Sequence, residues 1–109
     1  MIRISILYPT SGGSRFDHDY YRLRHLPLIK ERLGDACRHY AIDSGLAGDL
    51  AGGAPIYVAS CHIFCDSLEA FRSAIEPHAA ELTEDVANYT DIAPLMQISE
   101  VVEGVIPLL

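Results

Sequence analysis

The stretch from Phe16 to Leu28 reads FDHDYYRLRHLPL, and the rest of the chain is interpreted outward from it. It begins as an ordinary helix, because Asp17 is a good N-cap residue. Pro27 then falls inside the helix, where a proline removes a backbone hydrogen bond and clashes with the carbonyl four residues earlier. We therefore predict a helix over residues 18–33 that is distorted beside His25.

Segments typical of strands lie on both sides of this helix. Predicted strands cover residues 2–8, 37–46, 56–65 and 92–102. A second helix follows the third strand, with Asp66 and Glu69 at capping-box spacing, and Pro77 interrupts it. The order strand, helix, strand, strand, helix, strand is the ferredoxin-like βαββαβ arrangement, an α+β fold. We expect one domain over residues 1–109, with an antiparallel four-stranded sheet and two helices on one face.

Composition excludes several classes of partner. The net charge is −7 and lysine occurs only at position 30, so nucleic acid and anionic membranes are not expected partners. The sequence has no apolar run near the ~20 residues that cross a bilayer, and we expect a cytoplasmic protein. Cys61 and Cys65 lie roughly 13 Å apart along one predicted strand, too far for a disulfide. With Cys37 they are expected to be buried free thiols.

Apolar residues occur on both faces of every predicted strand. For example, one face carries Tyr57, Ile63 and Leu95, and the opposite face carries Val58, Phe64 and Met96. A sheet with one face in water would carry polar residues there. Because leaving apolar surface in water is costly, we predict a homodimer in which two sheets pack through their open faces.

Several segments together resemble the EthD family, named after ethyl tert-butyl ether degradation. These segments are Phe16–Tyr21, His25–Leu28, Gly45–Gly48, Asp66–Phe71, Pro77–Ala79 and Asn88–Ile92. The resemblance covers nearly the whole chain, and it implies a dimeric α+β barrel with an internal cavity. The family's namesake accompanies a cytochrome P450 system in ether breakdown, without an assigned reaction. Similar barrels include cofactor-independent monooxygenases, isomerases, cyclases and haem-binding proteins, so the fold alone does not select a chemistry.

His25 is the first candidate for a catalytic residue. An imidazole titrates near neutral pH and can move a proton in an isomerisation, enolisation or cyclisation. The alternative is a structural histidine that binds the backbone carbonyl freed by Pro27. Tyr21, one helical turn earlier, is the candidate that polarises a substrate carbonyl. Tyr20 is a candidate for binding the substrate. Neighbours on a helix point about 100° apart, so Tyr20 and Tyr21 cannot both face the core, and simple packing is the alternative role for either.

Four further residues are candidates for binding a substrate: His39, His62, Phe64 and Met96. Either histidine can point into the cavity from its strand. Cys37 and His39 share a strand face, but a metal needs at least three convergent ligands, so neither a metal nor another cofactor is expected. His78 and Asp91 are expected to serve capping or surface roles, although Asp91 could orient a histidine.

Three functions follow from these candidates. The first is a small enzyme that binds an apolar, oxygen-bearing molecule and uses His25 as acid or base. Its chemistry would be of the isomerase, cyclase or cofactor-independent oxygenase type, in the degradation of organic compounds. The second is a non-catalytic binding protein or an accessory to an oxygenase. The third is a haem-binding barrel.

Overall fold

The computed structural model describes residues 1–11 and 14–104. Its four strands are β1 (Ile2–Pro9), β2 (His39–Ser44), β3 (Tyr57–Cys65) and β4 (Leu95–Glu100). They form one antiparallel sheet in the order β2-β3-β1-β4. This order is that of the ferredoxin-like fold, and it confirms the predicted fold class.

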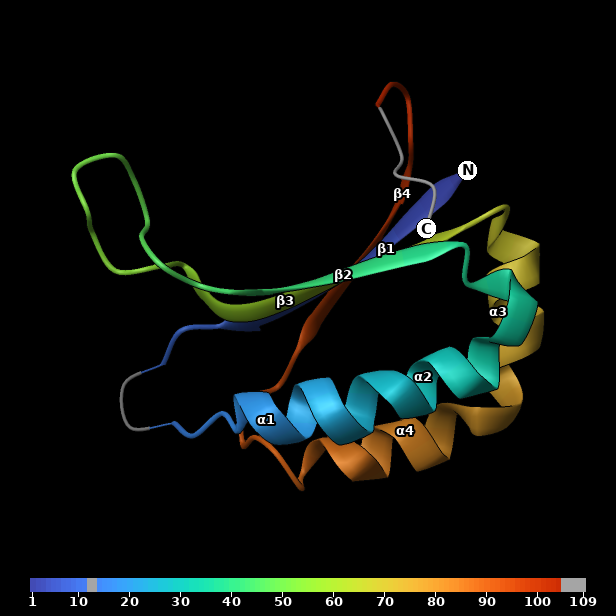
Figure 1. Cartoon of the computed structure of the whole chain (residues 1–109), viewed down its shortest axis with the longest axis horizontal. Helices are drawn as coiled ribbons and strands as arrows, with labels where there is room; N and C mark the ends of the chain where they lie inside the picture. The colour runs from blue at the N-terminus through green and yellow to red at the C-terminus, as the bar shows by residue number, and fades with distance from the viewer. Residues whose placement is uncertain (12–13, 105–109) are drawn as a thin grey trace.

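Two helical segments cover one face of the sheet (Figure 1). The first consists of α1 (His18–Tyr20), a π turn (Tyr21–His25), α2 (Leu26–Leu33) and a short 3₁₀ turn (Gly34–Ala36). The second consists of α3 (Leu68–Ile75), a 3₁₀ turn (Glu76–His78) and α4 (Ala79–Val86). Figure 1 shows α2 and α4 running side by side below the sheet, while the loop between β2 and β3 projects beyond the sheet's edge.

The distortion of the first helix precedes Pro27. The Leu26 N–H binds the carbonyl of Tyr21, five residues earlier, which defines the π turn. A regular helix restarts at Leu26, so Pro27 falls in the first turn of α2. A proline is tolerated there, because backbone N–H groups in a first turn have no partner within the helix. The predicted kink is therefore a widened turn that ends at His25.

The start of the second helix differs from the prediction. Ser67, and not Asp66, is the N-cap of α3, because its hydroxyl accepts the Ala70 N–H at 3.0 Å. Asp66 instead pairs with Arg38, whose Nη2 lies 2.6 Å from its Oδ2. In the first helix Asp17 is the N-cap, as predicted, and accepts the Tyr20 N–H at 3.0 Å.

The core lies between the sheet and the helices. Alternate residues of the central strands β1 and β3 face the helices and are buried, as Ile4, Tyr8, Cys61 and Ile63 are. Cys61 and Cys65 are buried free thiols, as predicted, and Cys37 is a half-buried one. The opposite face of the sheet is uncovered by any described segment and mixes apolar with polar side chains. Among the described residues, no helix is long and apolar enough to span a membrane.

Candidate functional site

An apolar cavity of about 190 Å³ lies between the sheet and the helices. Its walls include Ile6, Ile63, Phe71, Leu82, Val86 and Met96. Met96, on the edge strand β4, is 59% exposed, so the cavity reaches solvent along this strand. A larger hollow of about 460 Å³ lies beside His18, Arg22 and Asp43, and its rim is charged. The smaller cavity is the better candidate because it combines apolar walls with one titratable group.

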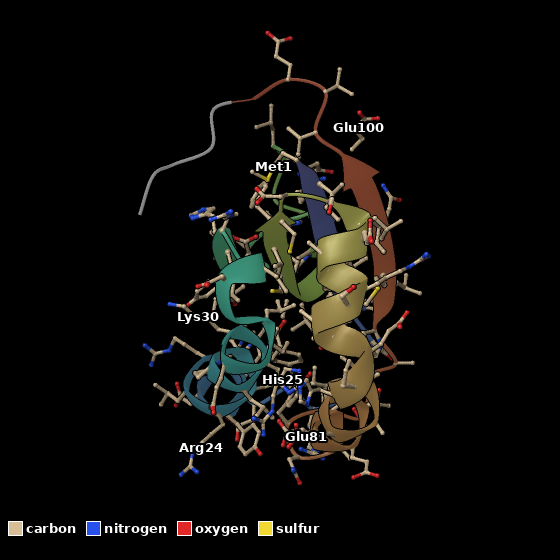
Figure 2. The ribbon with its side chains drawn as sticks, turned by 90° about the vertical axis from the view of Figure 1, so that its right-hand side faces the viewer. Met1, Arg24, His25, Lys30, Glu81 and Glu100 are labelled. Atoms are coloured by element: carbon tan, nitrogen blue, oxygen red, sulfur yellow. The ribbon has the colours of Figure 1, made fainter. Side chains whose placement is uncertain are left out.

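That titratable group is His25, which is 4% exposed and lines the cavity. His25 is the last residue of the π turn, a feature that often occurs at functional sites. Figure 2 shows its side chain between the two helical segments, whereas the neighbouring Arg24 points outward. The local distortion and the buried imidazole therefore coincide.

A carboxylate from the second helical segment meets this imidazole. Asp85 in α4 places its Oδ2 2.8 Å from His25 Nδ1. The other oxygen of Asp85 accepts the Tyr20 hydroxyl at 2.7 Å and the Asn88 amide at 3.0 Å. Asp85 thus receives three hydrogen bonds in a partly buried position.

The electrostatics favour a neutral imidazole beside an ionised carboxylate. Burial lowers the pKa of His25 below its usual range, and Asp85 only partly offsets this. Burial acts to raise the pKa of Asp85, but its hydrogen bonds from Tyr20, His25 and Asn88 outweigh burial and lower that pKa. Because an ionised carboxylate only accepts hydrogen bonds, the proton of His25 lies on Nδ1. Among the described residues no hydrogen bond to Nε2 is found, which leaves its lone pair available.

Aromatic rings hold the imidazole in place. The Tyr21 ring stacks on His25 with centroids 5.7 Å apart, and the Tyr89 ring packs at 4.7 Å. Tyr21 itself is buried, and its hydroxyl has no hydrogen-bond partner within the described residues. Burial raises the pKa of this hydroxyl. Tyr21 lines the larger hollow beside His18 and Arg22, whereas the tyrosine in the wall of the smaller cavity is Tyr8.

The predicted binding residues divide between two faces of the sheet. Met96 lines the cavity with His25. His39, His62 and Phe64 lie on the open face, because their strand neighbours Tyr40, Ile63 and Cys65 face the helices. His62 Nδ1 lies 2.9 Å from the Ser5 hydroxyl on that face. These three residues therefore do not share a pocket with His25.

Tyr20 does not line the cavity; its hydroxyl donates to Asp85, and its ring stacks on Tyr89 with centroids 6.0 Å apart. Asp91 does not orient a histidine either: its carboxylate accepts the backbone N–H of Arg15 at 3.1 Å. His78 lies at the surface, 4.0 Å from Glu81. Sequence reasoning did not single out Asp85, Tyr8 or Tyr89 as site residues, although Tyr89 falls within the Asn88–Ile92 segment that carries the family resemblance. No group of three or more His, Cys, Asp or Glu residues suited to a metal occurs in the described part of the chain.

The sheet order, the one-sided helices and the internal cavity define a ferredoxin-like α+β protein with a histidine at its cavity. The EthD domain model matches residues 14–93, and the chain belongs to the EthD family. Among solved structures, an EthD-like protein from Ralstonia eutropha JMP134 shares 52% identity, over 94% of this chain and 92% of that one, with a TM-score of 0.89.

More distant structures share the fold. An EthD family protein from Bacillus halodurans C-125 is 17% identical, over 92% of this chain and 97% of that one, with a TM-score of 0.70. A dimeric ferredoxin-like protein of unknown function from Thermobifida fusca YX is 16% identical, over 89% and 87% of the two chains, with a TM-score of 0.54. No curated protein matches the sequence significantly.

Proposed function

We propose that this EthD-family protein binds a small, apolar, oxygen-bearing molecule in the cavity and uses His25 as a general acid and base. One observation carries the proposal: the buried imidazole of His25 lines an apolar cavity, its Nδ1 is bound to Asp85 at 2.8 Å, and the described residues supply no hydrogen-bond partner for its Nε2. The family's name, from ether degradation, supports a ligand from the breakdown of an organic compound.

The chemistry is proton transfer at a carbon next to a carbonyl. Nε2 takes the proton from that carbon, and the electron pair moves into an enolate. The protonated Nε2 then returns a proton to this or another carbon, after exchange with solvent where solvent reaches it. Asp85 stabilises the imidazolium that forms. The hydroxyl oxygens of Tyr8 and Tyr89 are 2.6 Å apart. When Tyr89 donates in this hydrogen bond, the Tyr8 hydroxyl keeps its own proton, with which it can polarise the carbonyl of the ligand. The same proton abstraction begins isomerisation, cyclisation and oxygenation without a cofactor.

The cavity limits the size of the ligand. An apolar cavity of roughly 150 Å³ binds benzene, so about 190 Å³ accommodates a slightly larger molecule. A porphyrin exceeds this volume and would have to extend out of the cavity along β4, where Met96 is exposed. A ring of five or six carbons that carries one carbonyl matches both the volume and the chemistry.

Exchange of α-hydrogens of cyclopentanone in D₂O, followed by NMR, tests the proposal without knowledge of the natural substrate. The wild-type protein should accelerate exchange above the buffer rate, and His25→Gln should return it to that rate. Arg24→Gln is the matched control, because this neighbour is exposed and points away from the cavity. Equal exchange by wild type and His25→Gln would exclude His25 as the base. Ligand-induced shifts of the His25 signals without any exchange would favour the non-catalytic binding protein.

The proposal includes a homodimer through the open face of the sheet. Leu95 is 53% exposed there, beside Leu7 of the neighbouring strand. The dimeric ferredoxin-like protein from Thermobifida fusca supports this assembly. Analytical ultracentrifugation should find a dimer, and Leu95→Asp should shift it toward monomer. A monomeric wild-type protein at micromolar concentration would contradict the assembly without affecting the His25 proposal.

A further inference from the structure

Asp85 is held in place by two donors that do not touch the cavity. The Tyr20 hydroxyl and the Asn88 side-chain amide both donate to Oδ1, at 2.7 and 3.0 Å. The same amide nitrogen lies 3.3 Å from the Tyr20 hydroxyl oxygen, which closes a small hydrogen-bonded ring. The other carboxylate oxygen, Oδ2, is left for His25 Nδ1 at 2.8 Å.

We propose that Tyr20 and Asn88 are positioning residues for His25 that act through Asp85. By binding Oδ1 they fix the orientation of the carboxylate with Oδ2 against Nδ1, and so they hold the imidazole in place while its Nε2 accepts a proton. A carboxylate bound only to His25 could rotate about its terminal bond, whereas rotation here breaks two further hydrogen bonds. The inference rests on the proposed role of His25 as the proton acceptor.

The π turn explains how Tyr20 and His25 reach one carboxylate. The two residues are five positions apart, and in a regular α-helix such residues point about 140° away from each other. A π turn closes its hydrogen bond over five residues, so residues with this spacing come to the same side of the helix. The turn covers Tyr21–His25 and therefore lies between them. The widened turn beside Pro27 thus serves the arrangement of the site.

A single substitution can test the tautomer. In an Asp85→Asn variant the side chain has one acceptor oxygen and one donor nitrogen. Tyr20 and Asn88 both donate to the Oδ1 position, so they retain the carbonyl oxygen there. The amide nitrogen then replaces Oδ2 and donates to Nδ1 of His25. The imidazole must move its proton to Nε2, which turns the cavity-facing nitrogen from an acceptor into a donor.

The experiment measures the ¹⁵N chemical shifts of the His25 imidazole above its pKa, without any ligand. Wild type should show a protonated Nδ1 and a bare Nε2, and Asp85→Asn should show the reverse. In the triple variant that adds Tyr20→Phe and Asn88→Ala to Asp85→Asn, the amide is free to rotate, and a substantial fraction of the original tautomer should return. Tyr20→Phe and Asn88→Ala in the wild-type background should leave Nδ1 protonated, because either oxygen of the carboxylate only accepts, but the less firmly held imidazole should give at least a several-fold lower exchange rate.

Arg32→Gln is the matched control. Arg32 binds Glu81 through Nε at 2.8 Å and Nη2 at 3.1 Å, so it also connects α2 to α4, but it does not contact His25. Its loss should leave the tautomer unchanged. A wild-type imidazole protonated at Nε2, or an Asp85→Asn tautomer that does not depend on Tyr20 and Asn88, would overturn the inference. If Asp85→Asn does not fold, the exchange rates of wild type, Tyr20→Phe and Asn88→Ala still decide the inference, and rates equal to wild type in both variants would overturn it. Correct tautomers without ketone exchange would instead contradict the proposed function alone.

Discussion

The hydroxyl oxygens of Tyr8 and Tyr89 are 2.6 Å apart, although the two residues are 81 positions apart in the chain. The bond joins the central strand β1 to the segment after α4. Burial raises the pKa of both hydroxyls, so both remain protonated, one as donor and one as acceptor. The Tyr89 ring packs against the His25 ring with centroids 4.7 Å apart, so this hydrogen bond also fixes an aromatic ring that contacts the imidazole.

Tyr89→Phe should destabilise the protein by about 1–3 kcal/mol, because it leaves the buried Tyr8 hydroxyl without its partner. Urea unfolding measures this change. The double variant Tyr8→Phe with Tyr89→Phe should lose less stability than the sum of the single variants, since it leaves no hydroxyl unpaired. Tyr57→Phe, at the start of β3, is the control. Additive losses in the double variant would contradict a direct hydrogen bond between Tyr8 and Tyr89.

The stability of the fold should decrease at acidic pH through His25. Burial lowers its pKa in the folded state, despite Asp85, whereas its value in the unfolded chain is about 6.5. The unfolded state therefore binds more protons between these two values. Stability is complete above about pH 6.5 and is lost as the pH falls through the lowered pKa.

Urea unfolding of wild type and His25→Gln at about pH 7.5 and about pH 5.5 tests this linkage. The wild-type protein should lose more stability between the two conditions than the variant does. His18→Gln, at an exposed position, should behave like wild type. An equal loss in wild type and His25→Gln would show that another group is responsible.

Local sequence signals were sufficient to predict the order of the helices and strands. The residues around His25 could be found only from contacts in three dimensions. Asp17 and Pro27 indicate a helix start and a distortion because capping and proline chemistry act within one turn. The π turn inserts one residue into the helical period, which no hydrophobic pattern marks. Asp85 meets His25 across 60 positions of sequence, so only the packing of α4 against the first helical segment reveals the pair. Nothing in the strand alternation itself indicates which face the helices cover, and His62 was therefore misplaced.

The two candidate caps of α3 should differ in their effects. Ser67→Ala removes the hydroxyl that accepts the Ala70 N–H, and it should cost about 0.5–2 kcal/mol. Asp66→Ala removes a surface ion pair with Arg38, and exposed pairs contribute about 0–1 kcal/mol. Urea midpoints of both variants give the comparison. A larger loss for Asp66→Ala than for Ser67→Ala would assign the cap to Asp66 after all.

The proposed dimer should weaken in acid through His62 on the open face. His62 lies beside Ser5 at 2.9 Å, and its Nε2 is 3.6 Å from Asp43. Burial lowers the pKa of His62, Arg3 lowers it further, and Asp43 opposes both effects. A second sheet on this face would bury His62 more deeply and lower its pKa again. The dimer then binds fewer protons than two monomers, so acid favours dissociation.

Sedimentation equilibrium at about pH 7.5 and about pH 5.5 should therefore give a higher dissociation constant at the lower pH. The protein's net charge of −7 at neutral pH predicts the opposite trend, because acid reduces the repulsion between two copies. The sign of the change thus separates His62 from the overall charge. His62→Gln should abolish the acid weakening, and His39→Gln, on the same face, should retain it. Dimerisation that strengthens in acid, or that weakens equally in His62→Gln, would contradict the role of His62.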